Sequence, residues 1–439
     1  MRLLADADPV VRGEAGLIVA AQADPIHHSA ILHLARDDDV EARERGILAL
    51  GLQATPGVTA VLDDLLCDYQ TRTQPLGITA AFALGMLPPE HAPAMTSRIL
   101  TSFLEGSLKR QRDTLLALLL GLRRHEQGSQ TTALRRLFDD ESLRDPEVRA
   151  QLLALLLPVD RTFDAKALRR VLERGSDEER AALLTWLGPN ASACDSELVP
   201  LLERTALHGS QPEQRALALA VLTRLRHLPA LEIAAKALRS SSPIESGQAM
   251  RSVLGIGGAS MRRALEQRVL DESDPVRKAA LLQNYDAPLS TELGDACAHL
   301  AADESAPMPL RTAAATLLAR SAPERASPIL RDLFRATTVD ESLGTLAIAL
   351  LRDAPEPPAL SRLLDGPVDL RQHPARWQAL VAARHPEAVR QVLACLEAPN
   401  TSTADRTQAL SIWRRTMLLA LPRPRAGSLP AVLQTLLAD

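Results

Sequence analysis

The amino-acid sequence predicts an all-α protein that folds as a solenoid of about twelve to thirteen helix pairs. Composition is the first reason: 46% of the 439 residues are hydrophobic but only 2% are aromatic, which leaves Leu and Ala, the best helix formers, to fill the core. A β-rich protein would need more β-branched and aromatic residues. The second reason is a turn-and-helix element that recurs along the chain. Together they predict one continuous solenoid over residues 1–439.

The recurring element is a turn with Asp or Pro, then an arginine, then small or aliphatic residues three, four and seven positions later. Clear copies contain Asp8, Pro9 and Arg12; Asp39 and Arg43; Asp145, Pro146 and Arg149; Asp274, Pro275 and Arg277. We call the position of this arginine the anchor. It falls at Arg12, Arg43, Gly77, Arg112, Arg149, Arg180, Arg215, Gln248, Arg277, Arg311, Leu343, Arg376 and Arg406, and three of these anchors therefore lack the arginine. The mean spacing is about 33 residues, within the range typical of solenoids.

Each copy has the chemistry of a helix start. Asp accepts hydrogen bonds from the free amides of the first turn, and Pro suits the first helical position. In three copies the acid precedes the arginine by four residues, which favours an ion pair on one helix face. These pairs are Asp8 and Arg12, Asp39 and Arg43, and Asp145 and Arg149.

Second helices are expected between the anchor helices, because apolar stripes with helical spacing recur there. The expected segments are Val58–Cys67, Ala94–Leu104, Phe163–Leu172 and Ser196–Leu207. Pro- and Gly-rich breakers separate the helices at 88–89, 188–189, 257–258 and 357–358. Since one helix pair cannot bury its own apolar face, each pair must be stabilised by stacking on its neighbours.

The Asp-Pro-x-Val-Arg opening and the period resemble the HEAT repeat, especially the short bacterial variety of phycobilisome lyases. Asp8, Pro9 and Arg12 match this pattern, and Asp274 and Arg277 match it again. The resemblance implies a right-handed superhelix in which the anchor helices line the concave side. It transfers no catalytic residue.

The two ends of the chain differ. Residues 1–6 read as the tail of a first helix, so the N-terminal repeat is predicted to lack a polar cap, and an upstream domain or a partner is expected to cover it. At the other end, a helix through Trp413 to Leu421 is followed by a proline-rich breaker and a closing helix over 428–438.

Catalytic and metal-binding residues do not stand out. His27, His28 and His33 do not fall on one helical face, so no metal site is expected. No Ser or Cys is placed with His and an acid, and no glycine-rich phosphate loop occurs. The sequence therefore predicts a protein that is not an enzyme and needs no cofactor.

A basic run and one tryptophan are the candidate partner-binding residues. The run extends from Lys109 to Arg136 and contains few acidic residues. It either contacts a partner or forms a solvated face with ion pairs between repeats. Its arginines are Arg110, Arg112, Arg123, Arg124, Arg135 and Arg136. Trp377 follows an anchor arginine and is either an exposed hot spot or a side chain packed between repeats.

The function expected from these features is a scaffold or adaptor that binds another protein along its concave surface. Two alternatives stay open: nucleic-acid binding through the Lys109–Arg136 face, and a bilin-lyase-like accessory role. The net charge of −4 disfavours nucleic-acid coating through bulk charge. The sequence shows no leader peptide and no long apolar segment, so we expect a cytoplasmic location and no membrane contact.

Overall fold

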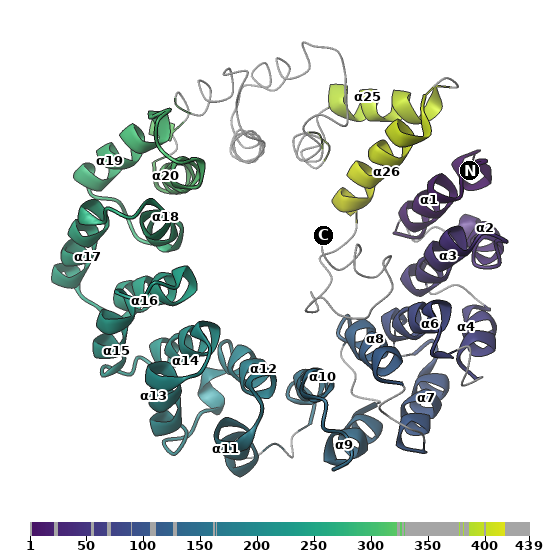
Figure 1. Ribbon diagram of the computed structural model, residues 1–439, viewed down its shortest axis with the longest axis horizontal. Helices are drawn as coiled ribbons and strands as arrows, with labels where there is room; N and C mark the ends of the chain where they lie inside the picture. The colour runs from purple at the N-terminus through teal and green to yellow at the C-terminus, as the bar shows by residue number, and fades with distance from the viewer. Residues whose placement is uncertain are drawn as a thin grey trace. The chain divides into compact units, whose positions relative to one another are not determined.

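The computed structural model describes residues 2–21, 25–53, 57–67, 72–88, 90–105, 111–125, 130–160, 163, 165–322, 325–326, 329, 377, 381, 386–398 and 401–417. Regular structure in these residues is helical throughout, and no described residue belongs to a β-strand (Figure 1). The predicted all-α class is confirmed.

The anchor residues that the structure describes fall within one series of helices, the anchor helices. Their bounds are α1 (Pro9–Ala21), α3 (Val40–Gln53), α6 (Pro75–Met86), α8 (Arg112–Leu122), α10 (Pro146–Leu156), α12 (Asp177–Leu187), α14 (Pro212–Arg224), α16 (Pro243–Ile256), α18 (Pro275–Asn284), α20 (Met308–Ser321) and α26 (Thr403–Met417). The anchors at 343 and 376 lie outside the described residues.

A second series alternates with the first. It comprises α2 (His28–Leu34), α4 (Val58–Leu66), α7 (Pro93–Glu105), α9 (Thr131–Asp139), α11 (Ala165–Arg174), α13 (Val199–His208), α15 (Ala230–Ala237), α17 (Ala259–Asp271), α19 (Thr291–Ala302) and α25 (Pro386–Glu397). The four second helices expected from the sequence are α4, α7, α11 and α13, displaced by no more than three residues at either end. Short 3₁₀ turns also occur at Arg2–Ala5, Pro25–His27 and Ala191–Ala193.

Contacts between helices are those of an α-solenoid. Each anchor helix packs on the next, from α1 through α3, α6 and α8 to α10, and again from α12 through α14, α16 and α18 to α20. The second helices contact one another in the same order, as in α4, α7 and α9 or α11, α13 and α15. The result is two layers of helices, with each pair stacked on its neighbours.

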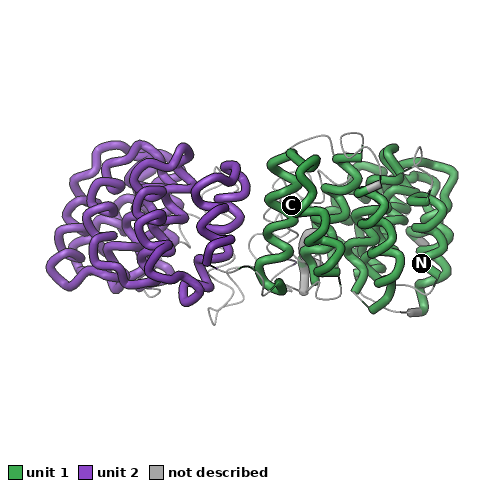
Figure 2. The backbone as a smooth tube through the Cα atoms, turned by 90° about the horizontal axis from the view of Figure 1, so that it is seen from below, with its two compact units in different colours: residues 1–163, 369–374, 388–439 green, residues 164–368, 375–387 purple. Residues whose placement is uncertain are grey.

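The chain divides into two compact units (Figure 2). Unit 1 comprises residues 1–163, 369–374 and 388–439, and unit 2 comprises residues 164–368 and 375–387. The boundary between them falls between α10 and α11.

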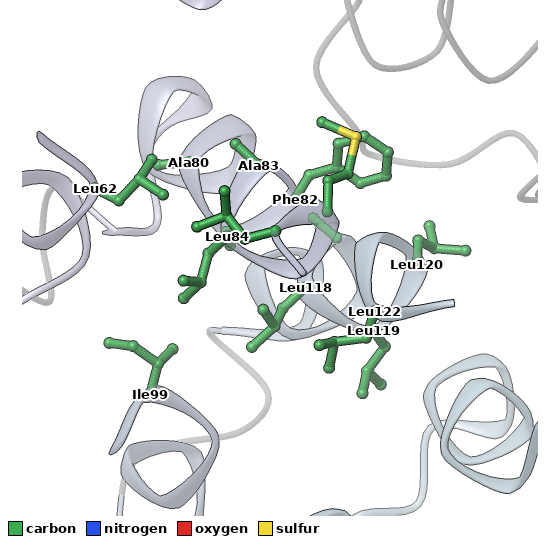
Figure 3. Packing of buried hydrophobic residues seen from close by; sticks show 14 of the residues in the cluster. Leu62, Ala80, Phe82, Ala83, Leu84, Ile99, Leu118, Leu119, Leu120 and Leu122 are labelled. Carbon is green, nitrogen blue, oxygen red and sulfur yellow. The ribbon is translucent and has the colours of Figure 1, made fainter. Parts of the chain in front are cut away.

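The core of unit 1 lies between the two helix layers and is mainly aliphatic (Figure 3). Phe82 on α6 and Leu118 on α8 are fully buried within it. Glycine lets these two helices approach closely: a Cβ atom on Gly121 would lie 2.3 Å from the carbonyl oxygen of Phe82, and one on Gly85 would lie 2.4 Å from that of Leu118. A side chain at either glycine would require the backbones to move apart.

The predicted helix caps are confirmed. Asp8 Oδ1 accepts a hydrogen bond from Val10 N at 2.9 Å, and Asp145 Oδ1 accepts one from Val148 N at 2.9 Å. The predicted ion pairs within single helices are wrong. In the described residues, Arg12 and Arg149 do not pair with these aspartates, because the carboxylates are engaged as caps and the guanidinium groups reach other acceptors.

The N-terminal repeat is not bare, which corrects the expectation from the sequence. Within unit 1, α26 packs on α1 and buries Leu410 against Val11 and Ile18. An ion pair joins Arg406 Nη1 to Asp6 Oδ2 at 2.7 Å. The apolar side of α1 is therefore packed against α26, the last helix that the structure describes. The predicted closing helix over 428–438 lies outside the described residues.

Candidate functional site

The anchor arginines hold the turns of the solenoid. In α1, α3, α10, α12, α14 and α20 the anchor is the fourth residue of its helix. Several of these anchors reach back to the chain before their helix: Arg12 Nη1 donates to the carbonyl oxygen of Asp6 at 2.8 Å, and Arg215 Nη1 donates to that of Gly209 at 2.7 Å. Arg43 likewise binds the carbonyl oxygen of Asp37, while Arg149 and Arg311 bind those of Phe138 and Ala301 in the last turn of the preceding second helix. These bonds satisfy loop and helix-end carbonyls that would otherwise need water.

Arg12 and Arg215 also link one repeat to the next. Arg12 Nε and Nη2 bind the Asp37 carboxylate at 2.9 and 2.8 Å, and Arg215 Nε and Nη2 bind the Glu245 carboxylate at 3.0 and 2.9 Å. The hydrogen bond from Arg12 lowers the pKa of Asp37. Burial acts to raise the pKa of Glu245, but hydrogen bonds from Arg215 and Ser240 outweigh it and lower that pKa. Such two-pronged pairs are the strong kind of ion pair, and they leave these anchors unavailable to a partner.

In its described residues, 111–125 and 130–136, the basic run from Lys109 to Arg136 does not form one free face. Arg112 begins α8 and binds three carboxylates: Asp145 through Nε at 2.7 Å, Glu147 through Nη2 at 2.6 Å and Asp113 through Nη1 at 3.0 Å. Asp145 and Glu147 belong to the next repeat, so Arg112 acts as a link between repeats.

On α9, Arg135 is also engaged and Arg136 is exposed. Arg135 Nε binds Asp139 Oδ2 at 2.9 Å, and its Nη1 lies 3.3 Å from the buried Asp160 Oδ2. Its guanidinium carbon lies 4.8 Å from the centre of the Phe163 ring, a cation–π contact.

At the end of α8, Arg123 Nη1 donates to Gln151 Oε1 at 3.2 Å. Arg124 is half-buried, its Nη1 has no hydrogen-bond partner among the described residues, and burial lowers its pKa. Arg110 lies outside the described residues. Of the described arginines of the run, Arg112 and Arg135 thus pair with acids of the next repeat, Arg123 and Arg124 lie at the end of α8, and Arg136 is exposed on α9 without an ion pair to a described residue, an arrangement that favours the structural interpretation of the run.

Trp377 does not offer an exposed ring. Only 7% of this residue is accessible, so the side chain is buried. A hot spot of the kind expected from the sequence would need an accessible indole.

An exposed row of apolar side chains is the feature that the sequence analysis missed. Ile244, Val276 and Pro309 occupy the second position of α16, α18 and α20, three anchor helices that pack side by side in unit 2. Ile244 is 51% and Val276 61% exposed, and Pro309 is exposed as well. The same position holds Glu178 in α12 and Glu213 in α14. We call Ile244, Val276 and Pro309 the apolar edge. Comparing the second helical position across the repeats would have found it.

The remaining reactive groups make no further site in the described residues. No cluster of three or more His, Cys, Asp or Glu side chains suited to a metal ion occurs among them. The four cysteines are not disulfide-bonded, and burial raises the pKa of the Cys297 thiol to about 12, so it is a packing residue. Of the helices described, none has both the length and the apolarity needed to cross a bilayer.

The fold defines the class of this protein: it is an all-helical repeat protein with the architecture of an α-solenoid. No protein-family model matches the sequence, and no curated protein matches it. Among known structures, the chain is similar to part of a homology model of the full-length AP-3 complex in an intermediate open conformation. That likeness has a TM-score of 0.35 and 11% sequence identity and covers 92% of this chain and 94% of the other. Values this low carry no argument about function.

Proposed function

We propose that this chain is a non-enzymatic scaffold or adaptor of the HEAT-repeat type that binds a protein partner along its anchor helices. The observation that carries the proposal is the apolar edge, Ile244, Val276 and Pro309. Single exposed aliphatic residues are ordinary on protein surfaces. Here, by contrast, three recur at one repeat position on adjacent helices.

The spacing of the edge suits a protein surface. Neighbouring helices pack about 8–10 Å apart, so the three side chains span roughly 20 Å. Fully burying an Ile or Val side chain contributes about 1.5–3 kcal/mol, so the edge could supply the apolar centre of an interface. Acidic residues at the same position in α12 and α14, Glu178 and Glu213, would form a polar rim beside it.

The test is affinity capture from a nuclease-treated lysate of the native host, using the full chain and the variant Ile244→Asp/Val276→Asp. Both positions lie in the first turn of a helix, where an acidic side chain is favourable to the helix dipole, so the variant is expected to fold. The matched control is Leu228→Asp, which changes an aliphatic residue 69% exposed that lies outside the edge.

The proposal expects one stoichiometric protein on the wild type and on the control, and at least a tenfold lower yield of it on the double variant. Equal capture by all three chains would show that the edge is not the binding surface. A ligand captured from an untreated lysate but not from the nuclease-treated one would instead favour nucleic acid.

A further inference from the structure

Unit 2 contains a cavity of about 570 Å³ between α11 and α13, closed on one side by the starts of α12 and α14. Its wall includes the basic side chains of Arg174, Arg180, Arg204 and His208. The volume lies within the range of about 300–1,000 Å³ typical of ligand pockets.

Two of these arginines lack a carboxylate partner. In the part of the chain that the structure describes, neither Arg174 nor Arg204 comes within ion-pair distance of an acid, although both line the cavity and are exposed. The nearby Glu173 is already engaged, since its carboxylate accepts a hydrogen bond from Arg169 Nε at 2.8 Å. That bond lowers the pKa of Glu173, and the charges of Arg174 and Arg204 lower it further. Glu173 thus pairs with Arg169 and feels the charges of Arg174 and Arg204 without pairing with either.

The other acid near the cavity is engaged as well. Asp177 pairs with Arg180, and both of its carboxylate oxygens lie 2.9 Å from Ser210 Oγ. Gln214, which also lines the cavity, donates from Nε2 to the Asp177 carbonyl oxygen at 3.0 Å. Hydrogen bonds from Gln214, Arg180 and Ser210 lower the pKa of Asp177. Positive charge on the cavity wall is therefore in excess.

We propose that this cavity binds a phosphoryl group. Arg174 and Arg204 come from successive second helices, so two guanidinium forks reach the cavity from different elements. A guanidinium fork matches the paired oxygens of phosphate, and two forks suit a dianion better than the single charge of a carboxylate. His208 adds a third donor on the same wall. This inference does not depend on the apolar edge or on a partner bound there.

The test is calorimetric titration of the full chain with inorganic phosphate, with a phosphoserine octapeptide and its unphosphorylated form, and with acetate at matched ionic strength. The test variant is Arg174→Gln/Arg204→Gln. The control is Arg170→Gln, which removes an exposed arginine from the same helix that does not line the cavity. Circular dichroism checks that each variant keeps the helix content of the wild type.

The proposal expects saturable binding of phosphate or phosphopeptide, a dissociation constant at least tenfold higher in the double variant, and a change of less than twofold in the control. Tighter binding of the phosphopeptide than of free phosphate would identify a phosphorylated protein segment as the source of the group. The reverse order would identify a small phosphate compound. Absence of saturable binding, equal binding of acetate, or equal loss in the control would overturn the proposal.

Discussion

Replacing Arg215 by methionine tests whether an anchor arginine stabilises the solenoid. The variant keeps the apolar stem and removes the guanidinium group. It thereby deletes two hydrogen bonds to the Glu245 carboxylate and one to the carbonyl oxygen of Gly209. Methionine forms helices well, so helix propensity contributes little to the change.

The expected cost follows from the burial of the pair. The Arg215 side chain is 23% exposed and that of Glu245 is 9% exposed, so the carboxylate left behind is largely shielded from water. Removing one partner of a fully buried ion pair costs about 3–5 kcal/mol. Ser240 Oγ still donates to Glu245 at 2.7 Å, and Arg215 is partly exposed, which reduces the penalty. We expect a loss of about 2–3 kcal/mol in local unfolding free energy.

Hydrogen exchange read by mass spectrometry measures this loss repeat by repeat, which suits a solenoid because each repeat contacts only its neighbours. Faster exchange is expected in α14 and α16 of Arg215→Met. The control, Arg224→Met, changes an exposed arginine at the other end of α14 and should stay within about 0.5 kcal/mol of the wild type. If the two variants exchange alike, the anchor does not stabilise the repeats and the reasoning fails.

Three further predictions follow from the fold. Gly121→Val should destabilise unit 1 by about 1–3 kcal/mol in urea unfolding, because the Cβ atom of the valine would lie 2.3 Å from the backbone oxygen of Phe82. A variant as stable as the wild type would contradict this close packing. Arg406→Asp should repel Asp6 and speed hydrogen exchange in α1, and unchanged exchange there would argue against the contact with α26. Because the folded pKa of Glu245 lies below its ordinary value of 4.5, its contribution to stability is full above that value and is lost as pH falls below it. The unfolding free energy should therefore fall less steeply with decreasing pH in Glu245→Gln than in the wild type. An identical pH dependence would contradict the lowered pKa of Glu245.

The positions of the helices could be predicted from the sequence because the signals are local. Asp and Pro at a helix start act through the first-turn amides, so Asp8 and Asp145 cap the helices as expected. The prediction was less accurate where the anchor has no such signal. In α16 the fourth residue is Ser246, two positions before the assigned Gln248. An apolar pattern alone does not fix the first residue of a helix, so the anchor can be assigned one or two positions away from its true place.

The candidate site was less predictable because it depends on contacts between repeats. In its own segment Arg112 has only Asp113 beside it, and its partner Asp145 follows about one repeat later. The exposed Ile244 and Val276 are likewise one repeat apart. Superimposing the repeats in the sequence could have suggested both relations. Exposure itself could not be inferred, since it depends on the packing of each helix end.

Contact between a protein partner and the apolar edge can be observed by hydrogen exchange of the chain with and without its captured partner. Slower exchange is predicted in the peptides that span Ser242–Gln248 and Asp274–Ala280, which contain the first turns of α16 and α18. The peptides around Leu228 should be unaffected. Slower exchange elsewhere in the chain, with no change at these two helix starts, would contradict the account.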